Sequence, residues 1–225
     1  MRVVAVIAGY NEEARIADAV RDALAYVPFA VVVDDGSRDK TGEVASKAGA
    51  HVLTHILNRG QGASLQTGMD YALNVLGAEA IVHFDADGQM RGGEIPLMLE
   101  PIMKGEADVV LGSRFLGREA ENMPGLRRAM ILLGVLFTRG LSGIKVTDTH
   151  NGFRAFSRNA GLSVRISLDR MAHASEILDI IVNKRLKYVE RPVTIRYSEE
   201  TLQKGQSTLK AMATATDILK KKLVG

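Results

Sequence analysis

Short β-favouring runs alternate with longer amphipathic stretches through the first half of the chain. The runs are rich in valine, isoleucine and leucine, as expected of strands buried on both faces, and they occupy residues 3–8, 30–33, 51–55, 81–84 and 108–114. The intervening stretches carry apolar residues at helical spacing, for example Ile16, Ala19, Val20 and Ala23. Strands that alternate with helices predict an α/β fold whose central sheet is mainly parallel and flanked by helices.

The second half of the chain has a different pattern. Residues 126–141 are strongly apolar with arginines at their edges, and they predict either a buried helix or a helix at a membrane interface. Their uncharged part, 129–137, is shorter than the roughly 20 residues that cross a bilayer. A helix is expected at 173–184 and a strand at 188–197. Residues 206–225 predict a basic amphipathic helix that either docks on anionic lipid or packs on the domain with its lysines in solvent.

Polar residues follow the predicted strands directly. Asp34 and Asp35 come after the second strand, Asp85 and Asp87 after the fourth, and Arg114 ends the fifth. Ligands of open α/β sheets bind beyond the carboxyl ends of the strands. We therefore expect these side chains to gather around one ligand.

Asp85 and Asp87 are spaced so that, in an extended strand, both side chains point to the same side. Two close carboxylates repel each other unless a cation lies between them, and oxygen ligands suit Mg²⁺ or Mn²⁺. With Gln89 as a third ligand, this segment predicts a metal site that takes its remaining ligands from a substrate phosphate. The alternative is a polar loop after a buried strand.

Length, charge and composition limit the classes of protein that this chain can belong to. The 225 residues favour a single domain over 1–225, with a nucleotide-binding half at 1–115 and an acceptor-side half at 116–200. The formal net charge of +3 does not argue for a nucleic-acid partner. The chain has no cysteine, so thiolate metal sites and disulfides are excluded. The N-terminus lacks the pattern of a signal peptide, and we expect a cytoplasmic protein that is either free in the cytoplasm or peripheral on the cytoplasmic face of the membrane.

Five short motifs occur in order along the chain. They are Tyr10-Asn11-Glu12-Glu13, Asp34-Asp35-Gly36-Ser37, Asp85-Ala86-Asp87-Gly88-Gln89, Gly112-Ser113-Arg114 and Gly152-Phe153-Arg154. Together they resemble the family 2 glycosyltransferases of the GT-A fold, over about residues 3–200, and most of all the dolichol-phosphate mannose synthases and bacterial polyprenyl-phosphate sugar transferases.

The resemblance implies a donor site for a UDP- or GDP-sugar. It assigns the nucleotide to Ala8, Tyr10, Glu12, Asp35 and Asp85, and the Mg²⁺ or Mn²⁺ cofactor to Asp85, Asp87 and Gln89. Each assignment has a plainer alternative. Glu12 would also suit the first turn of a helix, and Asp35 would suit the turn before Gly36.

The resemblance also implies catalytic roles for Asp87, Arg114 and Glu176. Arg114 would contact the diphosphate, since its planar fork suits phosphate oxygens; the alternative is a surface arginine. Glu176 would be a general base if the acceptor is a hydroxyl, whereas an ionised phosphate acceptor needs none. Helix capping or an ion pair is the alternative for Glu176.

An acceptor-side group is expected from the polar residues of the second half. These residues are Arg127, Arg128, Asp148, His150, Asn151 and Arg154. The two adjacent arginines would bind a lipid phosphate or merely flank a buried helix. The histidine would contact the acceptor or be structural.

Rival classes fit less well. A dehydrogenase would need Gly-x-Gly-x-x-Gly after the first strand, where this chain has Gly9-Tyr10-Asn11-Glu12. A nucleotidyltransferase would need a glycine-rich basic triphosphate loop there. A sugar-nucleotide-binding partner subunit would have lost the metal residues, which are present. The prediction is a metal-dependent, inverting transferase that moves a sugar to a polyprenyl phosphate, with a cell-envelope or exopolysaccharide hydroxyl as the alternative acceptor and possible contact with a membrane partner protein.

Overall fold

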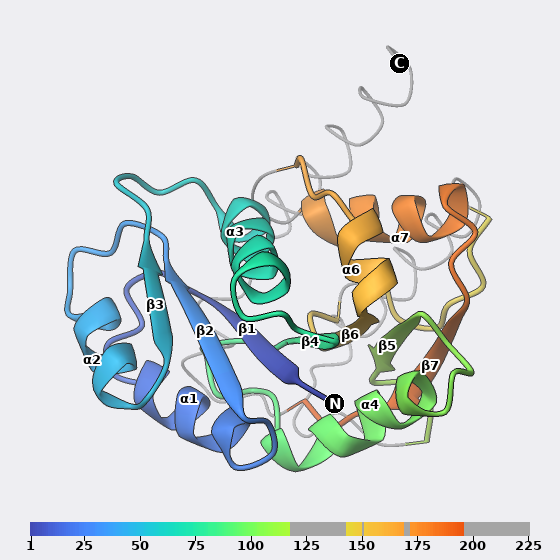
Figure 1. Cartoon of the computed structure of the whole chain (residues 1–225), viewed down its shortest axis with the longest axis horizontal. Coiled ribbons are helices and arrows are strands. Elements are labelled where there is room, and N and C mark those ends of the chain that lie inside the picture. The colour runs from blue at the N-terminus through green and yellow to red at the C-terminus, as the bar shows by residue number, and fades with distance from the viewer. Residues whose placement is uncertain (118–142, 150, 169–171, 196–225) are drawn as a thin grey trace.

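The computed structural model describes residues 1–117, 143–149, 151–168 and 172–195. Their strands form one sheet in the order β3-β2-β1-β4-β6-β5-β7 (Figure 1). The strands are β1 Val3–Gly9, β2 Phe29–Asp34, β3 His51–Thr54, β4 Ala80–His83, β5 Val109–Ser113, β6 Arg154–Ser157 and β7 Tyr188–Pro192. The helices are α1 Ile16–Leu24, α2 Thr41–Lys47, α3 Gln61–Asn74, the short 3₁₀ helix η1 Gly92–Glu94, α4 Ile95–Met103, α6 Arg158–Ser163 and α7 His173–Asn183.

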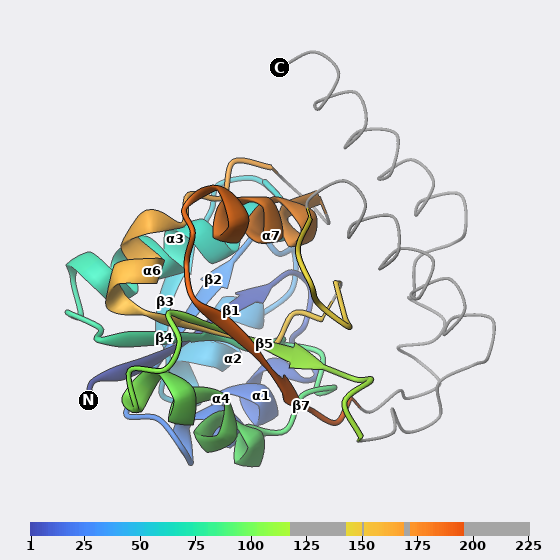
Figure 2. The same ribbon diagram turned by 90° about the vertical axis from the view of Figure 1, so that its right-hand side faces the viewer.

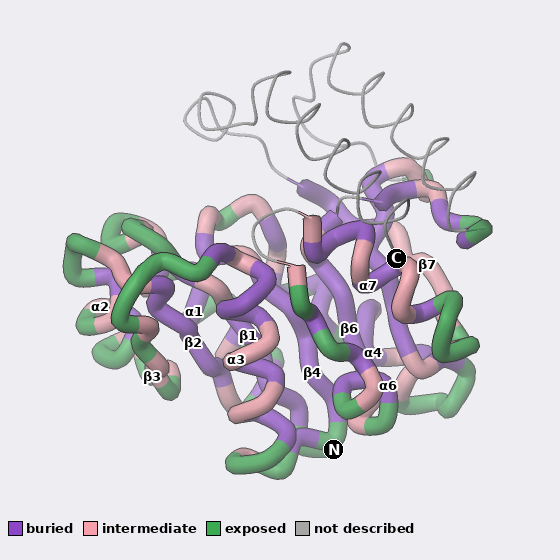
Figure 3. The backbone as a smooth tube through the Cα atoms, turned by 90° about the horizontal axis from the view of Figure 1, so that it is seen from above, coloured by how far each residue is buried: buried purple, intermediate pink, exposed green. Residues whose placement is uncertain are grey.

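Helices cover both faces of the sheet, as Figure 2 shows. On one face α1, α2 and α4 pack through residues such as Ile16, Ala45 and Met98. On the other face α3, α6 and α7 pack through residues such as Met69 and Ile177. Successive strand residues therefore alternate between two apolar layers, which is why the central strands are continuously hydrophobic. Figure 3 shows these strands buried beneath a more exposed surface.

The prediction of a mainly parallel α/β sheet is confirmed. β1 pairs in parallel with β2 and β4, and β5 pairs in parallel with β7. One strand was not predicted: β6 lies antiparallel between β4 and β5. Its sequence, Arg-Ala-Phe-Ser, includes an arginine and a serine and does not look like the interior of a sheet. Only the tertiary structure supplies the two neighbours that bury it.

Two predicted segments, 126–141 and 206–225, lie outside the described residues. The division of the chain into a nucleotide-binding half at 1–115 and an acceptor-side half at 116–200 remains a prediction. Among the described helices, none is long and apolar enough to cross a bilayer.

Candidate active site

The turns after β1 and β2 are joined by hydrogen bonds at the carboxyl edge of the sheet. The Asn11 backbone N–H donates to Ser37 Oγ at 3.0 Å, and Asn11 Oδ1 accepts from the Arg38 N–H at 2.9 Å. Asn11 has a φ of 54°, a left-handed conformation that asparagine tolerates better than most residues. The next N–H, of Glu12, donates to Thr41 Oγ1 at 2.8 Å. These contacts hold the first two predicted motifs side by side.

The Asp35 carboxylate is buried and accepts several hydrogen bonds. Its donors are the backbone N–H groups of Arg59 at 2.9 Å and Gly60 at 2.7 Å, and His55 Nδ1 at 2.7 Å. Burial alone would raise the pKa of Asp35, but these bonds and one with Ser64 hold it below its usual value. The ionised carboxylate thus holds the turn that begins α3, which is not the turn before Gly36 that the sequence offered as the alternative for Asp35. Its assignment to the nucleotide stays a prediction.

His55 is a site residue that the sequence pattern did not reveal. With Asp35 ionised, His55 Nδ1 donates to that carboxylate and Nε2 accepts from the Thr67 hydroxyl at 3.0 Å. The His55 ring therefore links the Asp35 carboxylate to Thr67 on α3. The only signal in the sequence was a histidine as the last residue of a predicted strand, and β3 itself ends one residue earlier at Thr54.

The remaining predicted nucleotide contacts lie on or just after β1. Ala8 is half-buried, and the Tyr10 side chain is 42% exposed. Glu12 pairs with Arg15, whose Nε and Nη2 lie 2.9 and 2.7 Å from Glu12 Oε2. An exposed ring beside a partly buried ion pair is an arrangement that can receive a base and a ribose.

The two aspartates after β4 lie close enough to disturb each other's ionisation. Burial and then the charge of Asp87 raise the pKa of Asp85 to about 7, against the opposing charges of Arg154 and Arg114. Burial and the charge of Glu12 raise the pKa of Asp87. The Gln89 N–H donates to Asp87 Oδ1 at 3.0 Å and keeps the turn compact. The charge of Asp87 thus acts on Asp85, whereas the convergence of the two side chains on one ligand stays a prediction.

These residues fit a hard divalent cation. Within the described ranges, no three His, Cys, Asp or Glu side chains gather in a way that could hold a metal ion, so the protein ligands would be Asp85 and Asp87 with an amide oxygen such as that of Gln89. Burial is the largest cause of the raised pKa of each aspartate and a nearby carboxylate adds to it, and a bound cation would offset both effects. Gly152 keeps the approach open, because a Cβ there would lie 2.8 Å from Asp85 Oδ2.

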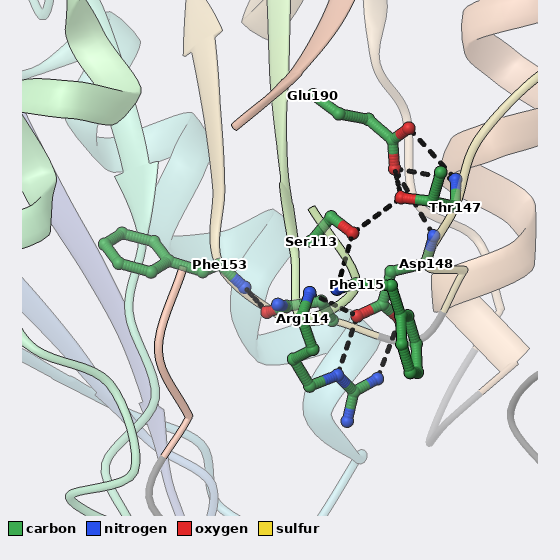
Figure 4. Close-up of polar contacts among 8 residues, drawn as sticks. Ser113, Arg114, Phe115, Thr147, Asp148, Phe153 and Glu190 are labelled. Carbon is green, nitrogen blue, oxygen red and sulfur yellow. Dashed lines mark hydrogen bonds and ion pairs between the residues drawn. The ribbon is translucent and has the colours of Figure 1, made fainter. Parts of the chain in front are cut away.

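Arg114 is held by Asp148 at the end of β5 (Figure 4). Its Nε donates to Asp148 Oδ2 at 2.6 Å, and its Nη2 donates to Oδ1 at 2.7 Å. Both side chains are buried, so solvent screens this bidentate pair little. Arg114 also lowers the pKa of Asp85, which places its charge near the proposed cation site. Asp148, expected on the acceptor side, is the residue that orients Arg114.

Residues 4–162 match the family model described as Glycosyl transferase family 2. The chain belongs to this family. It is 31% identical to the UDP-N-acetylglucosamine–dolichyl-phosphate N-acetylglucosaminyltransferase of Methanococcus voltae, over 91% of this chain and 89% of that relative. It is 30% identical to the polyprenol monophosphomannose synthase of Mycolicibacterium smegmatis, over 88% and 78% of the two chains. The predicted resemblance to polyprenyl-phosphate sugar transferases is confirmed.

Solved structures support the same fold. Glucosyl-3-phosphoglycerate synthase from Mycobacterium tuberculosis, in complex with Mn²⁺ and UDP-glucose, superposes with a TM-score of 0.75 at 19% identity, over 99% of this chain and 78% of the other. The GT-A-like architecture predicted for this glycosyltransferase is therefore confirmed.

Arg154, which was predicted for the acceptor side, is buried on β6. Its Nη2 donates to the Ala174 carbonyl at 3.3 Å. Burial lowers the pKa of Arg154 to about 10, while the charges of Asp148 and Asp85 oppose the shift, so the side chain is a cation at neutral pH. Arg154 therefore lies beneath the site as an internal counter-charge, and its predicted contact with an acceptor remains a prediction.

The other residues predicted for the acceptor side are only partly within the described residues. Asn151 Oδ1 accepts from the Phe153 N–H at 2.9 Å, whereas its Nδ2 is buried with no hydrogen-bond partner in the described part of the chain. Glu176 accepts from the backbone N–H groups of Ser167 at 3.0 Å and Leu168 at 2.8 Å, and from the Ser167 hydroxyl. These bonds tie the Ser167–Leu168 segment to α7, whose N-cap has no side-chain hydrogen bond, so they do not support the helix-capping alternative for Glu176. Arg127, Arg128 and His150 lie outside the described residues.

The raised pKa of Asp85 predicts a pH dependence for the metal-free enzyme. Between pH about 4 and pH about 7 the folded state retains a proton that the unfolded state has released. The free energy of unfolding should therefore fall as pH rises through this window. Urea denaturation in EDTA at a series of pH values measures it, with Asp85→Asn expected to show a flatter profile. Identical profiles for the two proteins would contradict the assignment.

Proposed function

We propose that this glycosyltransferase moves a sugar from a UDP- or GDP-sugar to a polyprenyl phosphate at the cytoplasmic face of a membrane. The observation that carries the proposal is the crowded Asp85–Asp87 pair, set at the ligand-binding edge of the sheet beside the clamped Arg114. The relatives named as dolichyl-phosphate and polyprenol transferases support the acceptor class. The neighbour solved with Mn²⁺ and UDP-glucose supports a divalent cation and a nucleotide-sugar donor.

In this proposal Asp85, Asp87 and Gln89 hold Mg²⁺ or Mn²⁺, which neutralises charge on the diphosphate when bound. Arg114 presents fixed N–H groups toward the same diphosphate. An acceptor oxygen attacks the anomeric carbon, the bond from that carbon to the diphosphate oxygen breaks, and the nucleoside diphosphate leaves with the bonding electrons. The attack comes from the opposite face of the sugar and inverts the configuration.

The contacts of Glu176 favour a phosphate acceptor over a hydroxyl. A hydroxyl must lose its proton to a base, whereas a phosphate is already ionised at neutral pH. The Glu176 carboxylate accepts hydrogen bonds from the Ser167–Leu168 segment, so base catalysis would compete with those bonds. The runner-up, transfer to a glycan hydroxyl, requires Glu176 as a base.

The test begins with ligand-induced stabilisation. Melting of the protein is followed with UDP, GDP, dTDP and CDP, each with and without Mn²⁺, because a ligand that binds only the folded state raises its stability. We expect one diphosphate to stabilise the protein in a metal-dependent way. Transfer from the matching radiolabelled sugar nucleotide is then assayed with polyprenyl phosphate in detergent and with a soluble glycan. A labelled glycan without a lipid-linked product would favour the runner-up, and no stabilisation by any nucleotide would refute the donor site.

A further inference from the structure

The segment that carries Asp148 has no regular secondary structure. Residues 143–149 belong to no helix or strand, so their backbone N–H groups need acceptors from elsewhere. The Glu190 carboxylate on β7 supplies them for Thr147 and Asp148, and the Tyr188 hydroxyl accepts from the Lys145 N–H at 3.1 Å. Glu190 Oε1 accepts from the Thr147 N–H at 2.8 Å, from the Thr147 hydroxyl at 2.9 Å and from the Asp148 N–H at 3.3 Å. Glu190 Oε2 also accepts from the Thr147 N–H, at 3.0 Å.

Two chains of hydrogen bonds lead from Glu190 to the end of β5 (Figure 4). One runs through Asp148, whose carboxylate grips the Arg114 guanidinium at two points. The other runs through the Thr147 hydroxyl, 2.6 Å from Ser113 Oγ, which in turn accepts from the Phe115 N–H at 3.1 Å. Both chains therefore end on the residues that surround Arg114.

Glu190 itself is fixed by the sheet. It lies opposite Leu111 in the parallel β5–β7 ladder, whereas Arg114 follows directly after the end of β5. A carboxylate on a paired strand is a rigid support, in contrast to a side chain on a loop. Glu190 can thus hold the backbone of Asp148 in a fixed place relative to the sheet, although the two residues are 42 apart in the chain.

We propose that Glu190 is a positioning residue for sugar transfer, which holds the Thr147–Asp148 segment so that Asp148 fixes the Arg114 guanidinium at the end of β5. The inference rests on the proposed function, since that function makes Arg114 a diphosphate contact. A guanidinium already held in one orientation loses less conformational entropy when a phosphate binds. Glu190 touches no substrate in this scheme and acts only through Asp148.

The orientation of Arg114 is measured directly by ¹⁵N NMR of its Nε–H group in the ligand-free protein, with Arg114→Lys used to assign the resonance. In the wild type we expect restricted rotation of the guanidinium, and in Glu190→Ala we expect an averaged signal at a shifted position. Glu190→Gln keeps one carbonyl oxygen where Oε1 accepts three bonds, so it should restore most of the wild-type signal. Glu100→Gln, which removes a carboxylate paired with Lys104 on the exposed side of α4, is the matched control and should change nothing.

Affinity for the stabilising nucleoside diphosphate with Mn²⁺ is measured on the same variants by calorimetry. Loss of a residue that orients a ligand-binding group typically costs about 10- to 100-fold in affinity, and we expect a loss of that order in Glu190→Ala and a smaller one in Glu190→Gln. In an Arg114→Lys background Glu190→Ala should cost little more, because the group that it positions has gone.

The outcomes distinguish the positioning role of Glu190 from the proposed donor site. An unchanged Arg114 signal in Glu190→Ala, or a lower melting temperature with unchanged affinity, would overturn the positioning role. An additive loss in the double variant would overturn it as well. If the wild type binds no nucleotide while the Arg114 signal still responds to Glu190→Ala, the donor-site proposal fails but the structural link stands.

Discussion

Asp87→Asn is expected to lower sugar transfer by at least about 100-fold, the upper range for residues that support a metal site. The substitution removes one of the two charges that would hold the cation, yet asparagine keeps an oxygen that can accept the Gln89 N–H bond now made at 3.0 Å. The turn should therefore survive while metal binding is lost. Because the pKa of Asp87 is raised by burial and by Glu12, removing its charge should leave the metal-free protein at least as stable as the wild type.

The measurement combines initial rates of transfer with melting curves in the presence and absence of Mn²⁺. Asp18→Asn is the control, since Asp18 is an exposed residue of α1 that pairs with Arg21 at 3.4 Å. We expect the control to keep both activity and metal-dependent stabilisation. If Asp87→Asn retained either of them at the wild-type level, Asp87 would not be a ligand of the catalytic metal.

The second large effect is expected on stability. Asp148→Ala should lower the free energy of unfolding by about 3–5 kcal/mol, the usual cost of removing one partner from a buried ion pair. The substitution leaves Arg114 buried without its bidentate acceptor, and it also removes a negative charge that favours the cationic form of the buried Arg154. Each of these two buried cations would then lose a charge that offsets its desolvation, and Arg154 would keep only that of Asp85.

Urea denaturation of three variants tests this expectation. Asp70→Ala breaks a pair with Arg165 in which both side chains are well exposed, and it should cost no more than about 1 kcal/mol. The double variant Arg114→Met, Asp148→Ala should recover part of the loss, because it no longer buries the unpaired guanidinium. Equal losses for Asp148→Ala and Asp70→Ala would show that the Arg114–Asp148 pair does not contribute as a buried pair.

The strands and the acidic motifs were predictable because their signals are local. A strand covered by helices on both faces must be apolar throughout, as Val31, Val32 and Val33 illustrate. Asp85 and Asp87 were predictable as a pair from their spacing just after a hydrophobic strand, although β4 ends at His83 and Asp87 lies in the turn that follows rather than in an extended strand. The antiparallel β6 was not predictable in this way, since Arg154 is a buried charge whose compensation comes from Asp85 and Asp148.

By itself, the sequence determined the α/β architecture, the edge of the sheet where ligands bind, and the pair of aspartates that suits a divalent cation. The tertiary structure decided which polar groups hold one another: His55 with Asp35, Asp148 with Arg114, and Glu190 with the Thr147–Asp148 segment. The physical reason is distance along the chain. Backbone periodicity and strand-end chemistry act over a few neighbouring residues, whereas an ion pair between residues 34 apart exists only after the sheet has brought its strands together.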